Sequence, residues 1–105
     1  LMTVKLGILM DPIESIHVKK DTSFAMMLAA QNRGWEINYF TDQNIFWQEG
    51  NLFAHVNLLN VFDDEKKWFE IKSQKMIDLT TLDVILIRKD PPFDSQYLYA
   101  TQLLE

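Results

Sequence analysis

The chain has 105 residues, a formal net charge of −5, 48% hydrophobic residues and no cysteine. This length fits one domain with a real core, and the missing cysteines exclude disulfides and thiolate metal sites within the chain. The acidic balance argues against nucleic-acid binding, because phosphate neutralisation needs clustered Lys and Arg. No apolar run reaches the ~20 residues of a membrane span, and no signal-peptide pattern opens the chain, so we expect a cytoplasmic protein.

The first 40 residues carry the pattern of a strand, a helix and a second strand. Residues 4–10 form a short apolar run typical of a buried parallel strand, and residues 11–20 fit a loop. The Asp-Thr-Ser triplet at 21–23 supplies N-cap residues ahead of a helical pattern, and Gly34 stands where a C-cap glycine belongs. Residues 35–40 alternate and are rich in strand formers, so the segment predicts a βαβ unit.

The middle of the chain predicts a hairpin, and a further buried strand follows it. Residues 44–61 are two aromatic or β-branched stretches around a turn at 49–51. Residues 63–71 fit either a helical turn or a third strand. Residues 84–87 are apolar without polar alternation, which predicts that helices cover both faces of that strand. The expected fold is a Rossmann-like α/β domain, with an open, mainly parallel sheet flanked by helices and an inserted β-hairpin.

Both predicted parallel strands end in charged, stiff loops. Asp11 and a proline stop the first strand, while Arg88, Asp90 and two prolines follow the second. Ligands of open α/β sheets bind beyond the carboxyl ends of the parallel strands, so both loops are expected at one crevice. Arg88 is suited to hold a carboxylate through its guanidinium fork, and a stiff loop loses little entropy on binding. A plain turn explains each Asp-Pro pair as well, so both interpretations stay open here.

Other kinds of site find little support in the sequence. The three glycines lie far apart, so there is no glycine-rich phosphate loop. His17 and His55 have no partner at metal-ligand spacing. Lys19 and Lys20 precede a helix N-terminus, but a capping Asp21 beside two solvated lysines explains them better than an anion site. The sequence therefore assigns no catalytic, cofactor-binding or metal residue within this chain.

Three strings of the sequence resemble the N-terminal domain of bacterial glutathione synthetases. They are KLGILMDPI at 5–13, KKDTSFAMMLAAQNRGWEINYF at 19–40 and LDVILIRKDPPFDSQYLYATQLLE at 82–105. The strings agree with the family in order and spacing over roughly the first and last thirds of the chain. The resemblance implies that residues 1–105 form a pre-ATP-grasp domain, and that the ATP-grasp domain is absent from this chain.

The resemblance also implies a substrate site and a reaction. The family joins γ-glutamylcysteine to glycine with ATP and Mg²⁺ through an acyl-phosphate. Asp11, Arg88, Asp90 and Phe93 are the implied substrate-binding residues, with Arg88 on a carboxylate and Asp11 or Asp90 on the ammonium. ATP and Mg²⁺ belong to the full-length enzyme, and this chain alone is expected to bind neither.

The resemblance implies a homo-oligomer, usually a tetramer in bacteria, and the aromatic hairpin at 45–61 is the contact we expect. Leu1 stands before Met2, and the helical pattern at 95–105 has no end signal, so we expect a piece of a longer protein. The isolated piece is expected to be inactive, because the nucleotide-binding elements are missing from it.

Three alternatives remain open at this point. Another ATP-grasp peptide ligase would use the same pocket wall. A non-enzymatic, flavodoxin-like binding or receiver domain would share the fold, although the sequence offers Asp11 without the acidic pair that a receiver needs. A pure assembly domain would use the aromatic hairpin for contacts and leave the charged loops as turns.

Overall fold

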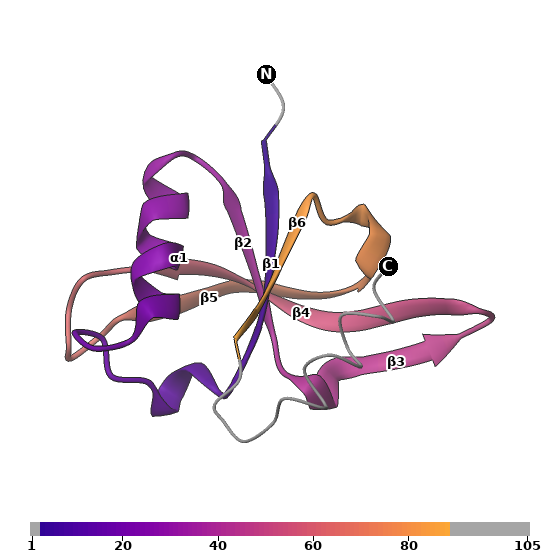
Figure 1. Cartoon of the computed structure of the whole chain (residues 1–105), viewed down its shortest axis with the longest axis horizontal. Coiled ribbons are helices and arrows are strands. Elements are labelled where there is room, and N and C mark those ends of the chain that lie inside the picture. Colours follow the sequence, from indigo (N-terminus) through magenta and orange to yellow (C-terminus); the bar gives the residue numbers. More distant parts are fainter. Residues whose placement is uncertain (1–2, 89–105) are drawn as a thin grey trace.

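The computed structural model describes residues 3–88. Within them, six strands form one sheet and one α-helix packs against it (Figure 1). Asp90, Phe93 and the predicted helix at 95–105 lie outside the described residues. The elements are β1 (Lys5–Met10), η1 (Ile13–Ser15), α1 (Thr22–Asn32), β2 (Glu36–Phe40), η2 (Asp42–Asn44), β3 (Ile45–Gln48), β4 (Asn51–Val61), β5 (Phe69–Asp78), η3 (Leu79–Thr81) and β6 (Val84–Arg88).

The predicted strand–helix–strand unit is confirmed, and its helix has both expected caps. The side chain of Asp21 accepts a hydrogen bond from the Phe24 N–H at 3.0 Å, which satisfies a backbone donor of the first turn. At the other end, Gly34 has a φ of +80° and donates its N–H to the Gln31 carbonyl at 2.9 Å. Glycine adopts this left-handed conformation without the penalty that a Cβ imposes, so it ends the helix cleanly.

The prediction of a mainly parallel sheet is wrong. The strand order is β3-β4-β2-β1-β6, with β5 paired to the far edge of β4. Among the described strands, the parallel pairs are β1–β2 and β1–β6. The other three pairs are antiparallel and join β4 to β2, β3 and β5. The physical reason is the length of the connections, because short turns join antiparallel strands and a parallel pair needs a crossover of a dozen residues or more.

Strand β4 organises the antiparallel half of the sheet. A two-residue turn joins β3 to β4, with positive φ at Glu49 (53°) and Gly50 (83°), as tight hairpins require. β2 and β3 pair with successive parts of one edge of β4, and β5 pairs along its other edge. Residues 63–71, which fitted two structures, contain the start of β5. In Figure 1, β4 and β5 run across the direction of β1, which reflects the twist of the sheet.

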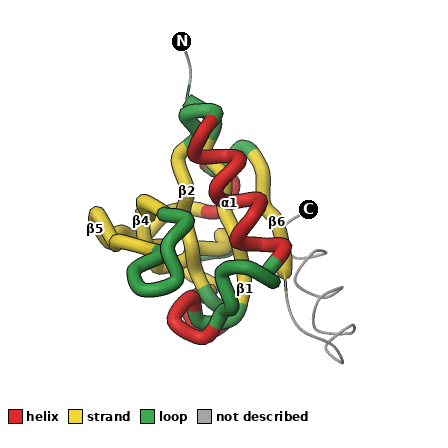
Figure 2. The backbone as a smooth tube through the Cα atoms, turned by 90° about the vertical axis from the view of Figure 1, so that its left-hand side faces the viewer, coloured by secondary structure: helices red, strands yellow, loops and turns green. Residues whose placement is uncertain are grey.

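The sheet carries a core on each face, and within residues 3–88 an α-helix covers one of them. α1 lies over β1, β2 and β6 (Figure 2), where Phe24 and Met27 pack against apolar residues of the strands. On the opposite face, Ile87 packs with residues of β4 and with Leu79 of η3. In residues 3–88, β4 and η3 line this second face of β6. The helix predicted at 95–105 lies outside the described residues, so helices on both faces of residues 84–87 stay a prediction. Val84, at the start of β6, is 43% exposed.

Gly7 in the middle of β1 leaves space that side chains from neighbouring segments fill. A Cβ at this position would collide with Cδ1 of Leu82, which lies on the chain just before β6. The absence of a side chain at Gly7 therefore leaves room for the Leu82 side chain against β1.

Candidate functional site

Arg88 and Asp11 lie at the same edge of the sheet, as the sequence predicted for the ends of two parallel strands. In the β1–β6 register, Met10 stands opposite Arg88, and Asp11 follows Met10 directly. Arg88 is exposed and Asp11 is half-buried. The edge thus offers a guanidinium and a carboxylate on neighbouring strands, a pair that can orient a ligand carrying both charges.

The first turn of α1 meets this edge through Arg88. The Nε–H of Arg88 donates a hydrogen bond to Oγ of Ser23 at 3.1 Å. Ser23 is the second residue of α1 and is buried. The contact joins positions 65 residues apart, so it places the end of β6 against the helix N-terminus.

Two aromatic side chains fix the loop that follows Asp11. The Ile13 N–H donates to the Tyr39 hydroxyl at 3.0 Å, and Nε1–H of Trp68 donates to the Ile13 carbonyl at 3.0 Å. The side chain of Ile13 is itself fully buried. Both backbone groups of Ile13 are therefore satisfied by side chains from distant strands and loops, which holds the residue in one place beside the site.

The hydroxyl of Tyr39 is held in its neutral form at this position. Burial raises the pKa of Tyr39 above its ordinary value of 10.0, and the nearby carboxylates of Glu14 and Asp11 raise it further. The hydrogen bond from Ile13 opposes this rise without cancelling it.

Tyr39→Phe should destabilise the protein by about 1–3 kcal/mol near neutral pH, because the buried Ile13 N–H loses its acceptor. The raised pKa means that the folded state keeps the Tyr39 proton after the unfolded state has lost it. The parent should therefore lose stability as the pH rises above about 10, and this loss should be smaller in Tyr39→Phe. Urea unfolding of both proteins between pH 8 and 11 measures the difference. An equal loss in both would show that Tyr39 is not the responsible group.

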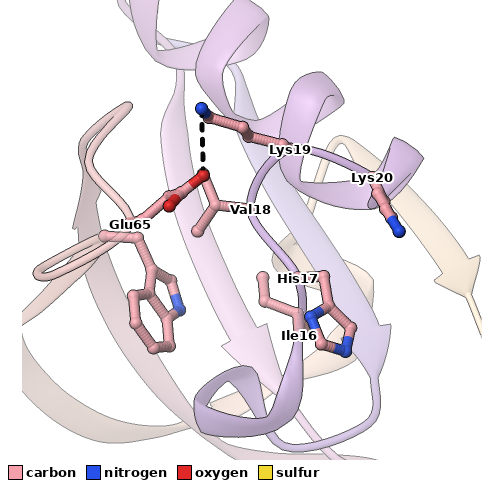
Figure 3. Close-up of a pocket in the computed structure, with 7 residues that line it drawn as sticks. Ile16, His17, Val18, Lys19, Lys20 and Glu65 are labelled. Carbon is pink, nitrogen blue, oxygen red and sulfur yellow. Dashed lines mark ion pairs between the residues drawn. The ribbon is translucent and has the colours of Figure 1, made fainter.

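A hollow of about 420 Å³ lies between the loop that precedes α1 and the β4–β5 loop. Figure 3 shows Lys19 reaching toward Glu65, at an N–O distance of 3.1 Å, while Lys20 points away from it. Both members of the pair are largely exposed, at 76% and 61%, so the ion pair contributes little to stability. The expectation of a capping Asp21 beside solvated lysines agrees with this arrangement. The lining residues are Ile16, His17, Val18, Lys19, Lys20, Glu65 and Trp68.

The sequence located two residues of this edge and missed three. Asp11 and Arg88 are at the predicted edge, whereas Asp90 and Phe93 lie outside the described residues, so their roles stay predictions. Ser23, Tyr39 and Trp68 were not recognised as parts of the site. Ser23 alone had a local signal, since it follows the Asp-Thr pair at the predicted start of the helix.

Residues 3–88 contain neither a metal-binding cluster nor a membrane-spanning helix. No group of three or more His, Asp or Glu side chains is arranged to hold a metal ion there. Nor does that part of the chain contain a helix with the length and hydropathy of a membrane span.

Comparison with known proteins gives a consistent result over nearly the whole chain. Glutathione synthetase of Vibrio parahaemolyticus is 51% identical over 102 residues, covering 97% of this chain and 32% of that protein. Glutathione synthetase of Pseudomonas putida is 52% identical over 104 residues, covering 99% of this chain and 33% of that protein. The chain thus spans about a third of the length of these curated relatives. The family model described as the N-terminal domain of prokaryotic glutathione synthetase matches residues 4–105, and the chain belongs to this family.

Proposed function

We propose that this chain is the N-terminal, pre-ATP-grasp domain of a glutathione synthetase, with residues 1–105 as one domain. The full-length enzyme would join γ-glutamylcysteine to glycine with ATP, through an acyl-phosphate. The observation that carries the proposal is the match of residues 4–105 to the family model, together with about 50% identity to proteins named glutathione synthetase. A different ATP-grasp ligase is disfavoured, because each of these relatives carries the same name.

In this proposal the edge formed by β1 and β6 orients the dipeptide. γ-Glutamylcysteine carries two carboxylates and an ammonium. Arg88 is an exposed residue whose guanidinium suits one carboxylate, and Asp11 is a half-buried residue whose carboxylate suits the ammonium. Asp90 and Phe93 would complete the wall of this pocket. These roles are binding and orientation, which contribute to rate by holding the reacting groups in place.

The described residues do not fit ATP or Mg²⁺. The glycines at 7, 34 and 50 are isolated, whereas phosphate loops gather glycines in one turn. Residues 3–88 also lack a cluster of three potential metal ligands. We therefore propose that ATP and Mg²⁺ are held by other parts of the full-length enzyme, and that this chain binds neither alone.

The proposal predicts that the full-length protein forms glutathione and that the 105-residue chain does not. The measurement is ADP release that depends on γ-glutamylcysteine and glycine, with equal molar amounts of the two proteins. Omission of glycine from the full-length reaction serves as the control. A full-length protein without glycine-dependent turnover would contradict the proposed function. Turnover by the 105-residue chain alone would contradict the proposal that other parts of the enzyme hold ATP and Mg²⁺.

We further propose that the full-length enzyme is a homo-oligomer with contacts on the β3–β4 hairpin. Trp47 is 55% exposed, and Phe46 stacks on Phe53 with ring centroids 5.9 Å apart. Large apolar side chains in such positions often mark an interface. Trp47→Ser should lower the solution mass of the full-length protein, as measured by sedimentation. An unchanged mass in a folded variant would argue against this surface.

A further inference from the structure

The hydrogen bond between Arg88 and Ser23 holds the Arg88 side chain in one orientation at the candidate site. An arginine at an exposed strand end would normally sample many rotamers, and ordering such a side chain costs up to about 2 kcal/mol. Here the guanidinium is tied at Nε, 3.1 Å from the Ser23 hydroxyl. Much of the conformational entropy of the Arg88 side chain is therefore already lost before a ligand binds.

Ser23 is a firm anchor because the first turn of α1 is fixed on two sides. Asp21 accepts the Phe24 N–H at 3.0 Å, which ties the backbone of the turn. The Phe24 side chain has no exposed surface and packs in the core beneath the helix. Ser23 lies between these two residues and is itself only 6% exposed. Its hydroxyl is therefore presented from a nearly fixed position.

The contact also decides which side of the guanidinium can meet a carboxylate. A guanidinium offers one fork made of Nε and one terminal nitrogen, and a second fork made of both terminal nitrogens. Ser23 engages Nε, which takes up the first fork. We propose that Ser23 is a positioning residue that directs the terminal Nη1–Nη2 fork of Arg88 toward a carboxylate of γ-glutamylcysteine, an inference that rests on the proposed function.

This role is separable from a purely structural one. Ala is a better helix former than Ser, and Asp21 remains the N-cap in Ser23→Ala. The substitution should therefore leave the melting temperature nearly unchanged. A positioning role predicts instead a higher KM for γ-glutamylcysteine, by about three- to tenfold, with the KM for ATP unaltered.

The experiment uses the full-length protein, four single variants and one double variant. Ser23→Ala removes the acceptor, and Ser23→Cys keeps the side-chain shape with a weaker acceptor, in case the first variant folds poorly. Thr22→Ala is the matched control, because it removes an exposed hydroxyl from the same turn. Arg88→Ala completes a double-mutant cycle with Ser23→Ala. The expected result is a raised KM for γ-glutamylcysteine in both Ser23 variants, no change in Thr22→Ala, and no further rise when Ser23→Ala is added to Arg88→Ala.

The failures of the two proposals differ in this design. A raised KM in Arg88→Ala with an unchanged KM in Ser23→Ala would overturn the positioning role and leave the binding role of Arg88 intact. The positioning role would also be overturned if Ser23→Ala raised the KM for γ-glutamylcysteine by the same factor in the parent and in Arg88→Ala. Ser23 would then act independently of Arg88. An unchanged KM in Arg88→Ala would overturn both the binding role of Arg88 and the positioning role of Ser23, since Ser23 would have no binding residue to position.

Discussion

Replacing Arg88 by Ala in the full-length enzyme should raise the KM for γ-glutamylcysteine by about ten- to a hundredfold. This is the loss expected when a charge-assisted hydrogen bond to a ligand carboxylate is removed. The KM for ATP should not change, because the described residues around Arg88 do not form a nucleotide site. Steady-state kinetics with each substrate varied in turn separates the two effects.

Arg88→Lys should recover little of the affinity, although it keeps the positive charge. A lysine ammonium lacks the planar fork that binds a carboxylate through two parallel hydrogen bonds. It also lacks the Nε–H that Arg88 donates to Ser23. Arg33→Lys is a suitable control, because Arg33 is the other arginine of the chain and lies exposed at the far end of α1.

Two results would contradict this role for Arg88. Unaltered kinetics for γ-glutamylcysteine in both variants would show that the guanidinium does not touch the dipeptide. A large fall in melting temperature would show that the side chain mainly holds the fold together. Melting temperature has to be measured because Arg88 joins the end of β6 to α1 through its hydrogen bond to Ser23.

The first 40 residues could be predicted because their signals are local. The N-cap Asp21, the helical spacing of Phe24 and Met27, and Gly34 after the helix all act within a few residues of one another. The structure has α1 at Thr22–Asn32 between β1 and β2, as expected. Here local preference and tertiary packing agree, which is the condition under which sequence patterns are reliable.

The antiparallel half could not be predicted because its pairing is not local. Most of β5 is exposed on both faces, so it lacks the alternation that marks a half-buried strand. Its position is set by pairing with β4, from Phe53 opposite Asp78 to Val61 opposite Phe69. The apolar run at 84–87 contributes to the cores on both faces of the sheet through Leu86 and Ile87, although Val84 is 43% exposed. The run does not specify whether helices or strands provide the cover.

In the candidate site too, the residues with local sequence signals could be predicted and those held by distant contacts could not. Asp11 and Arg88 could be placed at one edge, because the ends of two adjacent parallel strands coincide. Ser23, Tyr39 and Trp68 could not, since their hydrogen bonds reach residues 65, 26 and 55 positions away. Such contacts depend on the strand register and on the path of the loops. A family resemblance proposes candidate binding residues, but it does not show which side chains hold them.

Phe24→Ala should cause the largest loss of stability among the changes considered, about 3–5 kcal/mol. The Phe24 side chain is fully buried in the cluster between α1 and the sheet, so its removal leaves a cavity as well as losing apolar contact. A domain of this size is stable by only about 5–15 kcal/mol, so the variant should be close to unfolding. Urea denaturation measures the change, with the slope of the transition as a check on two-state behaviour.

Met26→Ala is the matched control, because Met26 lies on the same helix but is 40% exposed. It should lose far less stability than Phe24→Ala. Equal losses in the two variants would contradict the packing of α1 through Phe24. Since Phe24 directly follows Ser23, a loosened first turn should also weaken the hold on Arg88. At temperatures where Phe24→Ala is still folded in the full-length enzyme, the KM for γ-glutamylcysteine should therefore rise, whereas Met26→Ala should leave it unchanged.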